Sequence, residues 1–166
     1  MRTNIFIGGL AAVFALSAGL ACAATQAEIG SPNNPLSEKV RAANSRFQDV
    51  RTAIDEGYAP IPCASNANGG GAMGIHYVNA RYIADDNVEL ARPEAVMYEP
   101  MDDGSLALVA VEYITSKGPA SLEGHLFNFN GAPNRYGLGP FYELHVWAWK
   151  SNPTGTFADM NPDVSC

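Results

Sequence analysis

Between residues 36 and 56, apolar side chains recur at intervals of three and four residues, which is the spacing of one face of an α-helix. The members of this stripe are Val40, Ala43, Phe47, Val50 and Ile54. Most charged residues of the segment lie off the stripe. Pro35 suits the first turn of a helix, and Gly57 is typical of the position after a helix end. The pattern therefore predicts one amphipathic helix over residues 36–56.

The chain after this helix alternates between short β-rich runs and turns. The runs that predict strands are 75–79, 95–99, 106–114 and 141–149. Asp103-Gly104, between the second and third runs, is typical of a tight hairpin. Residues 58–74 and 117–140 are rich in Gly, Pro and Asn, so we expect loops there. One helix followed by antiparallel strands predicts an α+β domain, in which the helix packs on a curved antiparallel sheet or on a small β-barrel or roll.

The first residues have the three parts of a secretory signal peptide. Arg2 gives a short positive start, residues 5–20 are apolar and uncharged, and Ala21-Cys22-Ala23 fits the small-x-small pattern of a cleavage site. An uncleaved membrane anchor is the alternative, because the apolar run approaches the length of a spanning helix. Cys22 also raises a lipoprotein signal, although Gly19 occupies the place where such a signal has a large aliphatic residue.

This segment sets the expected organisation and location of the protein. We expect a signal peptide over residues 1–23, a flexible lead-in over 24–35 and a single α+β domain over 36–166. The mature protein is then periplasmic or extracellular.

Charge and cysteine content change when the signal peptide is removed. The whole chain has 10 Lys and Arg against 17 Asp and Glu, and loss of Arg2 makes the balance 9 − 17 = −8. Such an acidic chain argues against nucleic acid as a partner and, after signal cleavage, against an anionic membrane. Removal of Cys22 leaves Cys63 and Cys166, and an even number of cysteines in an exported chain predicts a disulfide. Two free thiols are the alternative.

Strand alternation places chemically useful residues side by side. In the strand predicted over 141–149, Glu143 and His145 lie on one face, about 7 Å apart along the strand at a rise of about 3.4 Å per residue. If a neighbouring strand brings His76 close, these three residues form a candidate site for zinc or another divalent transition metal. Glu112 and Glu99, also in predicted strands, are candidates for an additional carboxylate or a general base.

Other interpretations of the same residues remain open. A histidine in an aromatic strand is frequently a hydrogen-bonded core residue, and Glu143 is then only its partner. A third interpretation is a metal-free pocket for a small ligand. The residues proposed to line that pocket are Tyr77, Tyr98, Glu112 and Trp147. The run Gly69-Gly70-Gly71 lacks the Lys-Ser/Thr of a phosphate-binding loop, so we expect it to permit close backbone approach.

Several segments resemble a family of exported bacterial single-domain proteins of unknown function. These segments are Met73-Gly74-Ile75-His76-Tyr77-Val78-Asn79, Tyr98-Glu99-Pro100, Glu143-Leu144-His145-Val146-Trp147-Ala148-Trp149-Lys150, Asn152-Pro153 with Gly155 and Phe157, and Asn161-Pro162 with Val164-Ser165-Cys166. The resemblance covers most of the mature chain. It implies an exported single domain and draws attention to His76, Glu112, Glu143, His145 and the two cysteines, but it implies no known reaction or cofactor.

Taken together, these observations favour an exported domain that binds a small ligand or a metal ion. Its pocket would be lined by His76, Glu143, His145 and aromatic residues of the strands. The alternatives are a metal-dependent enzyme, with Glu112 or Glu99 as general base, and a structural or protein-interaction domain without a site.

Overall fold

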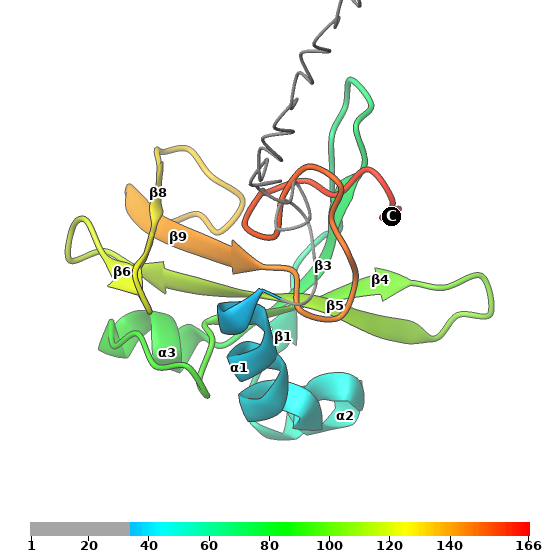
Figure 1. The fold of residues 1–166 in the computed structure, drawn as a ribbon, viewed down its shortest axis with the longest axis horizontal. Helices are drawn as coiled ribbons and strands as arrows, with labels where there is room; N and C mark the ends of the chain where they lie inside the picture. Colours follow the sequence, from blue (N-terminus) through cyan, green and yellow to red (C-terminus); the bar gives the residue numbers. More distant parts are fainter. Residues whose placement is uncertain (1–33) are drawn as a thin grey trace, which may run out of the picture.

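The computed structural model describes residues 34–166, so the predicted signal peptide and most of the lead-in lie outside the described residues. The described part is an α+β fold built on a seven-stranded antiparallel sheet (Figure 1). Its main path runs β1-β3-β4-β5-β9-β8, and β2 pairs separately with β3. The sheet remains open at its edges, so of the two predicted forms it is a sheet and not a closed barrel.

The four predicted runs coincide with long strands, although the last strand ends at Val146, three residues before the predicted end, and the loops contain additional short strands. The strands are β1 (Ala59–Pro60), β2 (Ala64–Ser65), β3 (Ala72–Val78), β4 (Ala95–Pro100), β5 (Leu106–Thr115), β6 (Ser121–Leu122), β7 (His125–Leu126), β8 (Asn128–Asn130) and β9 (Phe141–Val146). The Asp-Gly hairpin joins β4 and β5, as predicted, with Gly104 at a φ of +82°. The prediction of uninterrupted loops over 58–74 and 117–140 was wrong, because strands of two or three residues carry too little periodicity to detect.

The helical segment is broken where a single helix was predicted. It consists of α1 (Pro35–Asn44), the 3₁₀ turn η2 (Ser45–Gln48) and α2 (Val50–Asp55). Asp49 has an extended backbone, with a φ of −94° and a ψ of 110°, and its side chain accepts a hydrogen bond from the Arg51 amide. Asp49 therefore acts as the N-cap of a new helix. Val40 and Phe47, which precede this break on the predicted stripe, are fully buried, whereas beyond it Val50 is half-buried and Ile54 is 51% exposed, so the predicted stripe does not continue into α2.

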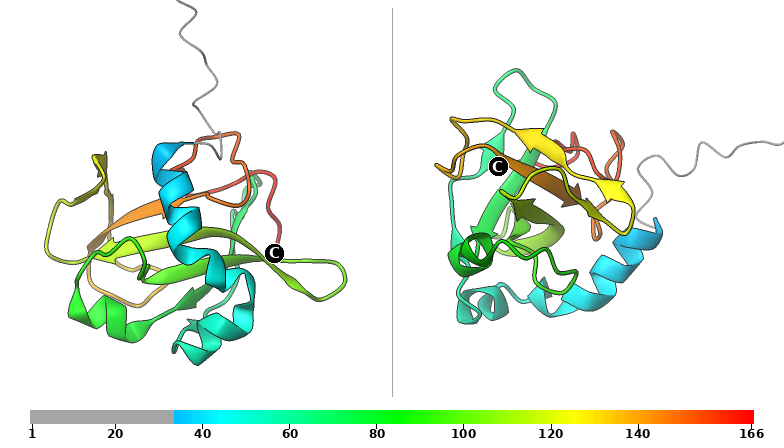
Figure 2. Two further views of the ribbon diagram at one scale, coloured as in Figure 1. Left: turned by 60° about the horizontal axis from the view of Figure 1, so that its bottom comes forward. Right: turned by 90° about the vertical axis from the view of Figure 1, so that its left-hand side faces the viewer.

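A further helix, α3 (Ala80–Asp85), was not predicted. It follows β3 directly, and the Asn79 side chain caps it by accepting a hydrogen bond from the Arg81 amide. Figures 1 and 2 show α1, α2 and α3 on one side of the sheet and the C-terminal segment on the other. None of the helices described within residues 34–166 is long and apolar enough to span a membrane.

The sheet has two chemically different faces. We call the side covered by the helices the helix face. Its main strand residues are Val96, Tyr98, Val111, Tyr113, Leu144 and Val146, which pack in one core with Leu36, Val40 and Phe47 of the helical segment. We call the opposite side the histidine face. Its main strand residues are His76, Met97, Ala110, Glu112, Glu143 and His145. Strand alternation creates this division, because successive side chains point to opposite faces.

The C-terminal segment, residues 147–166, covers part of the histidine face. Trp147 and Val164 pack there with Met97 in a second, smaller core. Cys63 and Cys166 lie at disulfide distance, with Cα atoms 5.8 Å apart, as the cysteine count predicted. A β-bridge joins Ala72 to Asn161, and a Cβ atom on the preceding Gly71 would lie 1.9 Å from the Asn161 carbonyl oxygen. The glycine run therefore does permit close backbone approach.

Candidate metal centre

Three strands of the histidine face bring His76, Glu112 and His145 together. Glu112 on β5 lies directly opposite His145 on β9 in the strand register. His76 reaches the pair from β3, across the intervening strand β4, where Ala95 is the register partner of Glu112. The small side chain of Ala95 leaves room for the longer side chains to meet above it. One potential ligand atom from each of the three residues lies within 4.8 Å of the others, and all three side chains are fully buried.

The two histidines converge on the same carboxylate oxygen. Glu112 Oε2 lies 3.4 Å from His76 Nε2 and 3.6 Å from His145 Nε2. Both separations exceed the 2.7–3.2 Å or so that is usual for N–H···O hydrogen bonds. Neither ring nitrogen of His76 has a hydrogen-bond partner among the described residues. A buried imidazole without partners is unusual, since most buried polar atoms are hydrogen-bonded.

A carboxylate from the C-terminal segment lies behind His145. Asp159 Oδ1 is 3.3 Å from His145 Nδ1, on the side of the ring opposite Glu112. This position favours a proton on Nδ1 and leaves the Nε2 lone pair directed toward Glu112 and His76. Burial alone would lower the pKa of His145, but the neighbouring charges of Glu112 and Asp159 outweigh it and raise the pKa. The pKa of His76 is lowered, chiefly by burial.

The loop over residues 131–140 supplies two more polar side chains to this cluster. Arg135 Nη2 lies 3.1 Å from Glu112 Oε1, 3.4 Å from Glu143 Oε2 and 3.4 Å from His145 Nε2. The Tyr136 hydroxyl donates a hydrogen bond to Glu112 Oε2. Burial raises the pKa of Glu112, but His145, His76 and Arg135 lower it more strongly, so the carboxylate is ionised. Glu112 is therefore the central anion of the cluster.

Glu143 lies beside the three convergent residues and not between the histidines. Its carboxylate accepts a hydrogen bond from Asn130 Nδ2 at 3.1 Å and contacts Arg135. Together with His145 and Asp159 it forms a second group with potential ligand atoms within 4.8 Å of one another. Burial, with a contribution from Glu112, raises the pKa of Glu143 to about 8. Of the predicted trio, the structure brings the two histidines together around Glu112, with Glu143 at the side.

Other residues singled out in the sequence lie elsewhere. Tyr98 is in the helix-face core, where it donates a hydrogen bond to the Phe47 carbonyl, and Tyr77 packs against its ring. Trp147 is on the histidine face, but its Nε1 donates to the Ala158 carbonyl in the smaller core. Glu99 forms an ion pair with Lys150 at 2.6 Å, remote from the histidines. Tyr98 and Tyr77 therefore lie on the other side of the sheet from His76 and His145.

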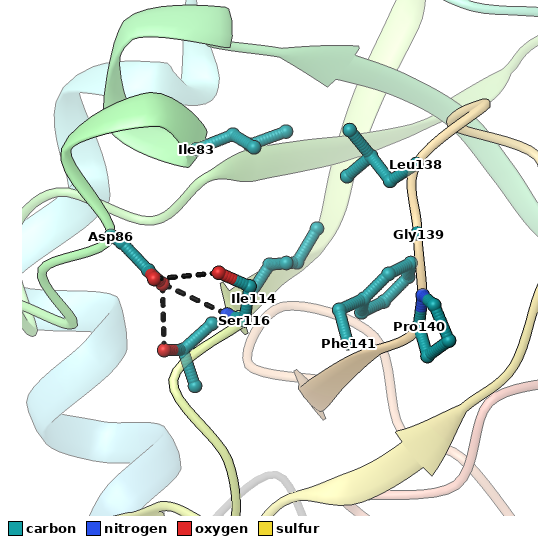
Figure 3. Close-up of a pocket in the computed structure, with 9 residues that line it drawn as sticks. Ile83, Asp86, Ile114, Ser116, Leu138, Gly139, Pro140 and Phe141 are labelled. Carbon is teal, nitrogen blue, oxygen red and sulfur yellow. Dashed lines mark hydrogen bonds between the residues drawn. The ribbon is translucent and has the colours of Figure 1, made fainter.

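A separate cavity of about 160 Å³ lies where the end of β5 meets α3 and the 131–140 loop (Figure 3). Ile114, opposite Glu143 in the register, and Phe141, two residues before Glu143, form part of its wall. Figure 3 shows Ile83 and Leu138 closing it from α3 and from the 131–140 loop, while Asp86 is hydrogen-bonded to Ser116 at its side. The histidines do not line this cavity, so its apolar space and the ionisable cluster are distinct features.

No sequence pattern points directly to Arg135, Tyr136 or Asp159. All three lie in segments without strand or helix periodicity, where neither spacing nor hydrophobic pattern indicates which way a side chain points. The only available hint was their presence in a long Gly- and Pro-rich loop and a polar C-terminal tail, which are frequent sources of functional residues.

Comparison with other proteins adds no assignment to this geometry. No protein-family model, no curated protein and no solved structure matches the chain.

Proposed function

We propose that this protein is an exported metal-binding module that holds a transition-metal ion between His76, Glu112 and His145. The observation that carries the proposal is the convergence of three buried ligand atoms from three strands. Zn²⁺ is the reference ion, because it commonly binds imidazole nitrogen and carboxylate oxygen.

The spacing of these atoms supports coordination over simple hydrogen bonding. Zn²⁺ binds histidine nitrogen at about 2.0–2.1 Å and carboxylate oxygen at about 2.0–2.2 Å, so neighbouring ligands of a tetrahedral site lie about 3.3–3.5 Å apart. The separations of 3.4 and 3.6 Å between Glu112 Oε2 and the two Nε2 atoms are close to this value. An ion can therefore bind after only small movements of the side chains.

The surrounding groups are of the kind that orient metal ligands. Histidine ligands usually donate their second ring N–H to a carboxylate or carbonyl, which fixes the tautomer and the ring orientation. Asp159 occupies that place for His145. Arg135 holds Glu112 Oε1, the oxygen that faces away from the two imidazoles. The convergent set is then Glu112 Oε2 with both Nε2 atoms. Oε2 accepts a hydrogen bond from Tyr136 and His145 Nε2 contacts Arg135, so these two contacts must open when an ion binds.

The balance of charge also favours a cation. Arg135 is the fixed positive side chain in contact with this cluster. The ionised Glu112 and Asp159 give 1 − 2 = −1 while Glu143, whose pKa is raised to about 8, keeps its proton. Release of that proton makes the sum 1 − 3 = −2. Buried charges without counter-charges are costly. A divalent ion would neutralise this excess, whereas in its absence protons must do so.

Export is the second part of the proposal. The predicted signal peptide over residues 1–23 would deliver the chain to an oxidising compartment, and the disulfide between Cys63 and Cys166 is compatible with that location. An oxidising compartment removes free cysteine thiols, but a metal site made of histidine and carboxylate ligands needs no cysteine and can form there.

The test is metal analysis of the full chain, expressed in an exporting bacterial host and purified without a His-tag. After treatment with a chelator and return of Zn²⁺, we expect one ion per chain and a higher melting temperature. His145→Ala and the size-preserving His76→Gln should both lose the ion and the thermal shift.

His125→Ala is the matched control. His125 is the third histidine, and it packs against Phe157 with ring centroids 4.2 Å apart, outside the cluster. This variant should bind Zn²⁺ as the wild type does. A wild-type protein that is folded by circular dichroism but takes up no stoichiometric Zn²⁺ would reject the proposed function.

A further inference from the structure

We infer that Tyr136 is a fourth ligand of this ion, so that the site is coordinatively closed and retains an ion instead of activating water. This inference rests on the proposed function and deepens it. Three protein ligands with an open fourth position are typical of catalytic zinc sites, whereas four protein ligands are typical of sites that only bind the metal.

The position of the phenol carries the inference. The Tyr136 hydroxyl contacts Glu112 Oε2, which is the same oxygen that faces both imidazole nitrogens. The Tyr136 ring stands edge-on to the His76 ring, with centroids 6.1 Å apart and an interplanar angle of 85°. The phenol oxygen thus contacts the carboxylate oxygen on which the two imidazole nitrogens converge.

The loop that carries Tyr136 is held in place by contacts independent of an ion. The Asn134 side-chain oxygen accepts hydrogen bonds from the amides of Tyr136 and Leu138 at 3.1 and 3.2 Å. The Phe141 ring packs against the other side of the Tyr136 ring, with centroids 5.6 Å apart. A ligand positioned before the ion arrives loses little conformational entropy on binding.

Binding exchanges one hydrogen bond for two coordination bonds. The phenol proton leaves to the buffer, and the phenolate and Glu112 oxygens then separate from hydrogen-bond contact to the spacing of neighbouring ligands. The guanidinium of Arg135 lies 4.8 Å from the centre of the Tyr136 ring and supplies positive charge next to the phenolate. Arg135 gives up its contact with His145 Nε2 at 3.4 Å, so that this lone pair faces the ion.

Copper(II) is a suitable probe, because phenolate bound to Cu²⁺ gives a visible charge-transfer band that imidazole and carboxylate ligands do not give. We expect the chelator-treated full chain to take up one Cu²⁺ and to show this band. Added azide should leave the spectrum unchanged, because no coordination position is open.

Tyr136→Phe should still bind Cu²⁺ through His76, Glu112 and His145, but without the phenolate band. It should bind azide, because loss of the phenol opens a position. In a competition with a chelator, its Zn²⁺ affinity should fall at least about tenfold, which is the lower limit reported for loss of even an outer-shell partner. Tyr142→Phe is the control, since this tyrosine packs against Phe129 on β8 and should leave the band unchanged.

The possible outcomes distinguish the role of Tyr136 from metal binding itself. A copper-loaded wild type that lacks the phenolate band would overturn the role of Tyr136, and one that shows the band but binds azide would overturn the closure of the site; either result leaves the metal-binding function intact. This readout needs only the wild-type protein, so it decides the matter even if Tyr136→Phe does not fold. A wild type that binds neither Cu²⁺ nor Zn²⁺ would overturn the proposed function and this inference together.

Discussion

The two faces of the sheet satisfy their buried polar groups in opposite ways. On the helix face, each buried tyrosine has its own backbone acceptor. Tyr58 donates to the Pro93 carbonyl, Tyr98 to the Phe47 carbonyl and Tyr113 to the Leu90 carbonyl, each at 2.7 Å. Each of these three phenols has a fixed main-chain partner, so the three pairs contribute stability and none of the phenols is left over for a ligand.

On the histidine face, polar side chains depend on one another. Arg135 is shared by Glu112, Glu143 and His145, while Arg135 Nε and both ring nitrogens of His76 lack partners among the described residues. Both faces are built from alternate residues of the same strands. The comparison shows that one sheet can have a tightly packed core on one face and, on the other, buried polar side chains whose hydrogen-bonding atoms lack partners and could bind an ion.

The largest expected effect of a single substitution is on the helix face. Phe47 is fully buried, and its ring packs against Tyr58 with centroids 5.2 Å apart. Phe47→Ala should lower the free energy of unfolding by about 3–5 kcal/mol, because it removes buried apolar area and leaves a cavity. Urea denaturation measures this loss.

Phe47→Ala also tests whether the helix face affects metal binding on the histidine face. At temperatures where Phe47→Ala is still folded, its Zn²⁺ affinity should match that of the wild type, because Phe47 is on the other side of the sheet. A large loss of affinity in the folded variant would mean that the two faces are not energetically independent.

A pH titration tests a buried carboxyl group near the helix-face tyrosines. Glu94 is fully buried, and burial raises its pKa from about 4.5 to about 8. Between pH 4.5 and pH 8 or so, the folded state therefore keeps a proton that the unfolded state has lost. The free energy of unfolding falls as the pH rises through this window and levels off above about pH 8. Glu94→Gln should remove this fall.

The expected signature is a difference between two curves. Wild type and Glu94→Gln should have similar free energies of unfolding at the acid end of the window, and the variant should be more stable by roughly 2–4 kcal/mol at its alkaline end. The pKa of Glu143 is also raised to about 8, so Glu143 lowers the free energy of unfolding with rising pH in both the wild type and Glu94→Gln. The difference between the two curves therefore reports Glu94 alone. Parallel curves would show that Glu94 does not keep its proton in the folded state.

The smallest expected effect concerns the outer edge of the histidine face. Asp159 is about half exposed, and it contacts His145 Nδ1. Asp159→Asn should weaken Zn²⁺ binding by about 10–100-fold, because it removes the partner that orients the imidazole. The ion-free stability should change by less than about 0.5 kcal/mol, as is usual for substitutions near the surface.

Asp163→Asn, in the same C-terminal segment but on an exposed residue, is the control and should have no effect on Zn²⁺ affinity. Isothermal titration of both variants gives the comparison. Equal affinities for the two variants would remove Asp159 from the site.

Strand periodicity accounts for what could be predicted about this site. The alternation in residues 141–149 correctly placed Glu143 and His145 on one face, and both are buried there. The register that sets Glu112 opposite His145 depends on how β5 and β9 pair. A single sequence does not encode that pairing locally, so strand alternation alone predicts Glu143 as a ligand, and Glu112 only as an additional carboxylate, a general base or a pocket residue.

The broken helix shows a related limit. Hydrophobic spacing places Val40 and Phe47 correctly in the core, but it also predicts a buried Ile54, which is exposed beyond the break. The break depends instead on Asp49, whose side chain competes for backbone amides and starts α2. Tertiary contacts decide between these alternatives, and they are not visible in the pattern.

The disulfide also makes the C-terminal two thirds of the chain into a covalent ring. Cys63 and Cys166 are separated by 103 residues, and the ring they close contains all three proposed ligands together with Tyr136 and Asp159. The helices α1 and α2 lie outside it. A protease that cuts once within the ring would therefore nick the chain without releasing a fragment, and every group around the ion would remain on one molecule.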